Sequence, residues 1–163
     1  MLKPLSLATA TAVVFALSAS SYAAEDQEKG ELKADLIACP HDGTILGGVN
    51  SCGKIWALTE GHVRLSSDGK LKVELEGLVL NDPTLPSNVN GTPDGVTAVV
   101  ASVICGGSGG AIQAQTDLVP ITSKGNAKIS ATVTLPKPCK APVVIIREFF
   151  DNKIGGWLAT IGI

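Results

Sequence analysis

The stretch KLKVELEGLV, residues 70–79, indicates the fold most directly because its side chains alternate in character. Apolar residues or glycine occupy the odd positions, and charged residues occupy the even positions as far as Glu76. A period of two is typical of a β-strand with one buried face. Residues 62–65 alternate in the same way, and the intervening SSDG is a turn sequence in which Gly69 can adopt a positive φ. We therefore expect a β-hairpin here.

The same design recurs 56 positions later along the chain. Residues 127–135 alternate between apolar and polar side chains, and they follow the turn sequence TSKG at residues 122–125. Alignment of Gly125 with Gly69 also places Ser123 on Ser67. We interpret this weak repeat as a second hairpin, and two similar hairpins favour two sheets packed face to face.

Other strand candidates are rich in Val, Ile and Thr and are bounded by Gly or Pro. They span residues 54–59, 96–105, 111–121, 143–149 and 157–161. Because no segment has a convincing helical pattern, the sequence predicts an all-β fold. We expect an antiparallel β-sandwich of seven to nine strands, immunoglobulin-like or of a related Greek-key type, with a small β-barrel as the alternative.

The N-terminus has the three parts of an export signal: Lys3, an apolar run over residues 5–17, and small residues over 18–24. We expect cleavage after Ala23. Because a membrane-spanning helix needs about 20 apolar residues, the run is too short to span a bilayer, and no later segment is longer. The predicted organisation is a signal peptide over 1–23, a charged flexible lead-in over 24–37, and a single domain over 38–163 that is secreted or periplasmic.

The charge balance limits the classes of partner that the chain would attract. The 163-residue chain has a formal net charge of −2, and removal of Lys3 with the signal peptide makes it −3, without blocks of like charge. This balance gives no general attraction to nucleic acid or anionic lipid. No motif calls for a cofactor, so we expect none.

Four cysteines lie in the exported part of the chain, where disulfides persist. Three pairings are possible. We favour Cys39 with Cys52 and Cys105 with Cys139, because each pair lies within one segment or in neighbouring segments.

Several pieces of the chain carry a resemblance to a family. They are Trp56, the motif GxVRL at 61–65, DGKLxVExEGLV at 68–79, and LPxPCxAPV at 135–143. In this order they resemble a group of uncharacterised small secreted bacterial all-β proteins, over roughly residues 43–163. The resemblance implies a small exported β-domain and no known activity, so it implies no functional residue.

The longest break between strand candidates, residues 81–95, is rich in Pro, Gly, Asn and Asp. Loops of this length are usually functional or mobile. The candidate binding residues in it are Asn81, Asp82, Asn88, Asn90 and Asp94, which could offer oxygen ligands to a cation such as calcium, although exposed turns use the same residue types.

Two motifs suggest chemistry. The sequence GGSGG at residues 106–110 matches the Gly-x-Ser-x-Gly nucleophile elbow, with Ser108 as nucleophile and His41 or His62 as base. A glycine-rich turn between two strands explains it equally well, because the following residues are a strand candidate. Cys39, His41, Asp42, Cys52 and His62 together could bind zinc or copper, but in an exported chain the cysteines are expected to oxidise, which leaves His41 and His62 as weak candidates.

Trp56 and Trp157 are expected in the core, or on a sheet face as a ligand platform. Taken together, the sequence favours an exported non-catalytic module with a binding or structural role. Its contact surface would be the 81–95 loop with the 106–110 turn, and its partner a protein or a cell-envelope ligand. The alternatives are an extracytoplasmic zinc- or copper-binding protein and a serine hydrolase that uses Ser108.

Overall fold

The computed structural model of the chain describes residues 30–161, which form strands, turns and loops but no helix. The expected signal peptide and the first part of the expected lead-in lie outside the described residues. The strands are β1 (Glu31–Ala38), β2 (Ile45–Leu46), β3 (Val49–Asn50), β4 (Trp56–Ala57), β5 (Glu60–Ser66), β6 (Lys70–Glu76), β7 (Val79–Leu80), β8 (Ala98–Cys105), β9 (Ala111–Gln115), β10 (Val119–Pro120), β11 (Ala127–Thr132), β12 (Val143–Phe150) and β13 (Lys153–Ile161).

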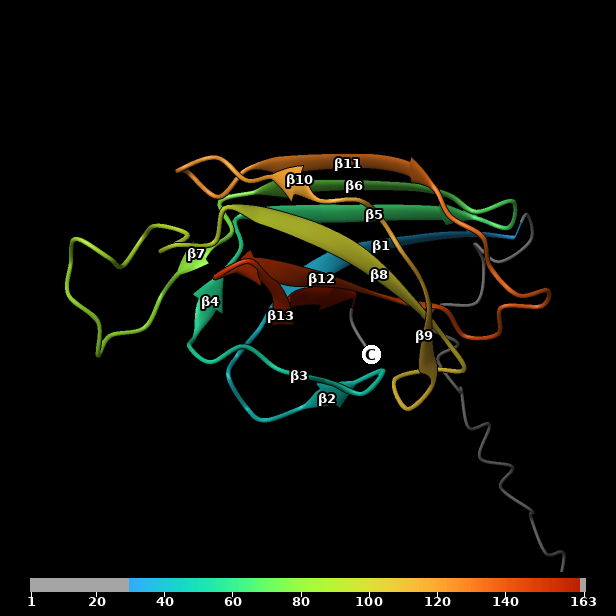
Figure 1. Ribbon diagram of the computed structural model, residues 1–163, viewed down its shortest axis with the longest axis horizontal. Helices are drawn as coiled ribbons and strands as arrows, with labels where there is room; N and C mark the ends of the chain where they lie inside the picture. Colours follow the sequence, from blue (N-terminus) through green and yellow to red (C-terminus); the bar gives the residue numbers. More distant parts are fainter. Residues whose placement is uncertain (1–29, 162–163) are drawn as a thin grey trace, which may run out of the picture.

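Nine of these strands form one antiparallel sheet, in the order β10-β8-β12-β13-β1-β5-β6-β11, and β9 also pairs with β8. The sheet curls so that an upper layer of β1, β5, β6 and β11 lies over a lower layer of β8, β12 and β13 (Figure 1). The two end strands, β10 and β11, contact each other. The predicted all-β antiparallel sandwich is confirmed, and it is built from a single sheet curled into a half-barrel.

Strand β1 connects the two layers. Residues Glu31 to Asp35 pair with β5 in the upper layer, whereas Leu36 to Ala38 pair with β13 in the lower layer. This corrects the expectation of a flexible lead-in over residues 24–37, which is a strand from Glu31 onward. The many charged residues of this segment suggested a flexible tail, but they alternate with less exposed residues in a period of two. Leu36 in this pattern is buried in the core.

The first expected hairpin is confirmed, since β5 and β6 pair across the turn at residues 66–69. Gly69 has a φ of 88°, and a Cβ there would lie 2.0 Å from the carbonyl oxygen of Val133, so only glycine fits. The second hairpin is wrong. The turn at residues 122–125 forms, but β11 then pairs with β6 in the upper layer, while the preceding β10 pairs with β8.

The central part of the lower layer is buried on both faces. In β8 every residue from Ala98 to Ile104 is buried, which explains its continuous apolar sequence. One face packs on the upper layer, and residues 40–55, which contain β2 and β3 and are called the flap, cover the other (Figure 1). The indole Nε1 of Trp157 donates to the carbonyl oxygen of Thr44 at 3.2 Å and so links β13 to the flap.

Both favoured disulfides are present. Cys39–Cys52 closes the flap, and Cys105–Cys139 joins the end of β8 to the segment that precedes β12. Because disulfides persist only where thiols are oxidised, they indicate an oxidising, extracytoplasmic environment. Residues 30–161 include no helix long and apolar enough to cross a membrane.

Candidate functional site

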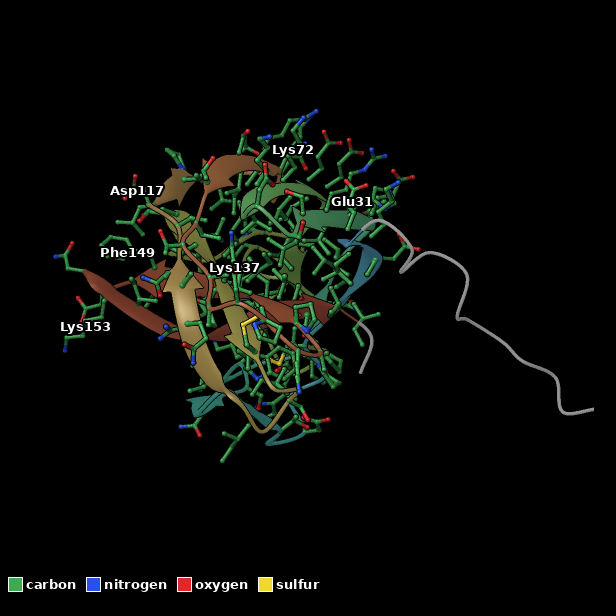
Figure 2. All side chains as sticks on the ribbon, turned by 90° about the vertical axis from the view of Figure 1, so that its right-hand side faces the viewer. Glu31, Lys72, Asp117, Lys137, Phe149 and Lys153 are labelled. Atoms are coloured by element: carbon green, nitrogen blue, oxygen red, sulfur yellow. A yellow bond between two sulfur atoms is a disulfide. The ribbon has the colours of Figure 1, made fainter. Side chains whose placement is uncertain are left out.

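A pocket of about 610 Å³ opens at one end of the sandwich, beneath residues 133–142, which lead from β11 to β12 and are called the strap. Residues 30–32 at the start of β1, residues 65–67 at the end of β5, and residues 135–142 of the strap line it. Figure 2 faces this end of the molecule, with Lys137 of the strap near the middle of the view. The pocket volume is in the usual range for small-molecule sites.

The wall of the pocket is mainly apolar. Leu32 and Leu65 extend from the upper layer, and Leu135 comes from the strap together with three prolines. Ser66 and Ser67 add hydroxyl groups on one side. An apolar wall with a few polar groups is typical of sites that bind small molecules by excluding water from an apolar ligand surface.

The strap is held in place at several points. The Cys105–Cys139 disulfide ties it to β8, and the amides of Gly106 and Gly107 donate to the carbonyl oxygens of Lys140 and Ala141 at 2.6 and 3.0 Å. Prolines fix φ and so reduce the freedom of the strap further. Because the pocket is formed before any ligand arrives, binding would carry little cost of ordering the chain.

Two lysines of the strap, Lys137 and Lys140, line the pocket and are exposed. Neither forms an ion pair with any carboxylate of residues 30–161. The one carboxylate in the lining, that of Glu31, lies 3.2 Å from the Nζ of Lys33. The strap therefore contributes two uncompensated positive charges.

The 81–95 loop lies at the opposite end of the sandwich from the strap (Figure 1, left). Several of its polar side chains form hydrogen bonds within the loop itself. The carboxylate of Asp82 accepts from the amide and hydroxyl of Thr84 at 2.9 and 2.6 Å, and these bonds lower the pKa of Asp82. Asn90 Oδ1 accepts from the amide of Asp82 at 3.0 Å, and Asp94 pairs with Lys54 at 3.8 Å. Asn81 and Asn88 are exposed.

The expected contact surface is therefore divided. The 106–110 turn lies beside the strap, to which it is hydrogen-bonded, whereas the 81–95 loop is at the far end. The structure does not bring the two segments together, so a single surface cannot use both. A binding role for the loop alone stays a prediction.

The residues that the sequence suggests as zinc or copper ligands do not form one cluster, because the two cysteines are bonded to each other and each histidine contacts a different group. Cys39 and Cys52 are bonded to each other, and His41 Nδ1 lies 2.7 Å from the carbonyl oxygen of Cys52. His62 Nδ1 lies 2.7 Å from Asp35 Oδ1 on the outer face of the upper layer. Within the described part of the chain, no three His, Cys, Asp or Glu side chains are grouped so that they could hold a metal.

Ser108 is exposed in the turn between β8 and β9. The turn leads from strand to strand, whereas a nucleophile elbow leads into a helix. The hydrogen bonds of both histidines go to other groups, and the Ser108 side chain has no hydrogen bond to any residue in 30–161. Its carbonyl oxygen accepts from the amide of Gly47 at 3.0 Å, which ties the turn to the flap. Among the glycines of the turn, Gly110 has no room for a Cβ, which would lie 2.1 Å from the carbonyl oxygen of Cys105.

Glu148 is the one carboxylate of β12, and its environment shifts its pKa. It is partly buried, and Gly155 opposite it has no room for a Cβ, which would lie 2.6 Å from Glu148 Oε1. The same oxygen accepts from the amide of Gly156 at 3.2 Å. Burial raises the pKa of Glu148 and outweighs this hydrogen bond.

We predict a pH dependence from this group. Since its folded pKa is raised, the folded state favours protonated Glu148, so the contribution of this group to stability is fully present below the ordinary Glu value near 4.5. This contribution is lost as the pH rises from there through the folded pKa. Glu148→Gln should remove this loss, which urea unfolding of both proteins between pH 4 and 7 will measure. With exposed Glu76→Gln as the control, parallel curves for wild type and Glu148→Gln would contradict the prediction.

Sequence reasoning missed the pocket. Its wall is formed by the start of β1, which was expected to be flexible, by the turn at residues 66–69, and by the strap. The motif LPxPCxAPV at residues 135–143 was visible, but only as part of a resemblance. The available signal was a proline-rich segment fixed by a cysteine, which indicates a rigid connection rather than a mobile loop.

Comparison of the chain with known proteins found no matching family model, no similar curated protein and no similar solved structure. The function is therefore argued from the geometry of the chain itself.

Proposed function

We propose that the chain is an exported, non-catalytic binding module that holds a small apolar molecule in the pocket beneath the strap. The observation that carries the proposal is the preformed, mainly apolar cavity of about 610 Å³ between the strap and the ends of β1 and β5. Burial of an apolar ligand there would gain roughly 25 cal/mol for each Å² removed from water. The rigid strap would keep the cost of binding low.

Export is supported by two independent features. The first residues of the sequence have the pattern of a signal peptide with a cleavage site near Ala23, and both disulfides need an oxidising compartment. The module would act in the periplasm or outside the cell. A ligand of the cell envelope or of the surroundings fits that location.

The test is the binding of N-phenyl-1-naphthylamine, a neutral apolar dye whose fluorescence rises when it leaves water. We expect saturable binding of about one dye per chain at the pocket. Ser67→Trp places a bulky ring at the pocket wall and should abolish most of the binding. The matched control is Ser123→Trp, since Ser123 is exposed in the similar turn at residues 122–125, outside the pocket lining, and it should bind the dye as the wild type does.

Two results would overturn the proposal. One is the absence of saturable dye binding to the folded wild-type protein. The other is equal binding by the two tryptophan variants, which would place the dye outside the pocket. Circular dichroism of all three proteins establishes that the variants keep the fold.

A further inference from the structure

The proposed binding function leaves open what kind of molecule the pocket accepts, and the charges around it bear on that question. The end of the molecule that contains the pocket carries a set of cationic side chains on the strap and on the adjoining ends of β1, β5 and β6. They are Lys33, Arg64, Lys70, Lys72, Lys137 and Lys140. Figure 2 shows Lys72 and Glu31 at the margin of this end and Lys137 near its centre.

Ion pairs neutralise only two of these cations. Lys33 pairs with Glu31 at 3.2 Å, and Lys70 pairs with Asp68 at 2.8 Å. Within residues 30–161 the other four form no ion pair. Arg64 and Lys72 even lie directly opposite each other on β5 and β6. Like charges in that position are destabilising, so this end of the chain retains positive charge at a cost in stability.

Within residues 30–161, Asp35 and Glu74 lie two positions from Lys33 and Lys72 on β1 and β6, and other carboxylates lie at the far end of the sandwich. Glu60 and Glu76 face each other at the opposite ends of β5 and β6, and Asp82 and Asp94 belong to the 81–95 loop at that same end (Figure 1). The strap contains no carboxylate, so the pocket lining holds two unpaired lysines against one carboxylate, Glu31, which is paired with Lys33. Such a field attracts anions to the pocket and repels cations from it.

We propose that the ligand is an amphiphilic anion, with an apolar chain or ring that enters the pocket and one acidic group that stays at its mouth. The apolar part lies against Leu32, Leu65 and Leu135. The acidic group accepts charge-assisted hydrogen bonds from the ammonium groups of Lys137 and Lys140, which are stronger than bonds between neutral groups. A carboxylate, sulfate or phosphate supplies the same chemistry.

The experiment compares two ligands with the same nine-carbon alkyl tail, decanoate with an anionic head group and decan-1-ol with a neutral one, by displacement of N-phenyl-1-naphthylamine at pH 7.5 from the mature protein. We expect decanoate to bind about tenfold more tightly, because two ion pairs with exposed lysines together allow a factor of this size. The double variant Lys137→Gln, Lys140→Gln should reduce this preference to about twofold and leave decan-1-ol unchanged. Rising salt should reduce the preference in the wild type because it screens the charges.

The matched control is the double variant Lys124→Gln, Lys153→Gln, which removes two exposed lysines outside the pocket lining and should keep the full preference. Equal affinity for decanoate and decan-1-ol in the wild type would overturn the anionic class while leaving an apolar pocket in place. Failure of the dye itself to bind would instead overturn the proposed function, so the two failures are distinguishable.

A second part of the experiment distinguishes binding of a free amphiphile from binding to a lipid in a membrane. Vesicles of phosphatidylcholine with and without phosphatidylglycerol are sedimented with the protein. We expect monomeric decanoate to occupy the pocket and neither kind of vesicle to carry the protein down. Co-sedimentation with the anionic vesicles alone, without displacement of the dye by decanoate, would assign the charge to a membrane surface and overturn the proposal.

Discussion

Replacement of Cys105 and Cys139 by alanine is expected to lower the free energy of unfolding by about 4 kcal/mol, because the disulfide closes a loop with a sequence separation of 34 residues. Both cysteines are only partly buried, so the loss of packing adds little. A loss of this size is a large fraction of the stability of a domain of this length. Urea unfolding of the oxidised wild type and of the double variant measures it.

The same replacement should also weaken the pocket. Without the disulfide, the strap keeps its hydrogen bonds to Gly106 and Gly107 but loses its covalent tie to β8. Dye affinity should fall together with stability. The control is Cys39→Ala with Cys52→Ala, which opens a separation of 13 residues in the flap and should cost about 3 kcal/mol of loop closure plus lost packing. That variant should keep the dye affinity of the wild type under conditions where it is folded, and a parallel loss of affinity would contradict a specific role for the strap.

The sequence was informative where one local pattern decides the structure. Alternation over residues 70–79 predicts β6 and its pairing with β5, because the side chains that must be buried lie within a few positions of each other. The pairing of Cys39 with Cys52 also followed from nearness along the chain, since their sequence separation is only 13 residues. In both cases the decisive interactions are short-range.

Longer-range features were not predictable in this way. β11 has the same pattern as β6, and nothing local says that it pairs with β6 rather than with the strand before it. The pocket depends on how the strap crosses the end of the sandwich, and this depends on which layer each flanking strand joins. β1 was missed for a different reason. Its exposed face carries as many charged residues as a flexible tail would, so its composition did not distinguish a strand from a tail.

The second large effect is expected at Trp157, a residue of β13 that is 2% exposed and contacts the flap. This burial makes it part of the core rather than a ligand platform, and Trp56 is buried as well, at 7% exposed. Trp157→Ala should lower the free energy of unfolding by about 3–5 kcal/mol, because it leaves a cavity that a disulfide-closed flap cannot collapse to fill. Urea unfolding followed by the fluorescence of Trp56 measures the loss.

Trp157→Phe separates the two contributions of this side chain. It retains an aromatic ring but removes the hydrogen bond to the carbonyl oxygen of Thr44, so it should cost clearly less than the alanine variant, with about 1 kcal/mol due to the hydrogen bond. If the flap owes its position to this ring, amide exchange in residues 40–51 should rise in Trp157→Ala while β5 and β6 stay protected. A loss below 1 kcal/mol with unchanged exchange would contradict this prediction and would mean that the Cys39–Cys52 disulfide holds the flap against β13 without the indole ring.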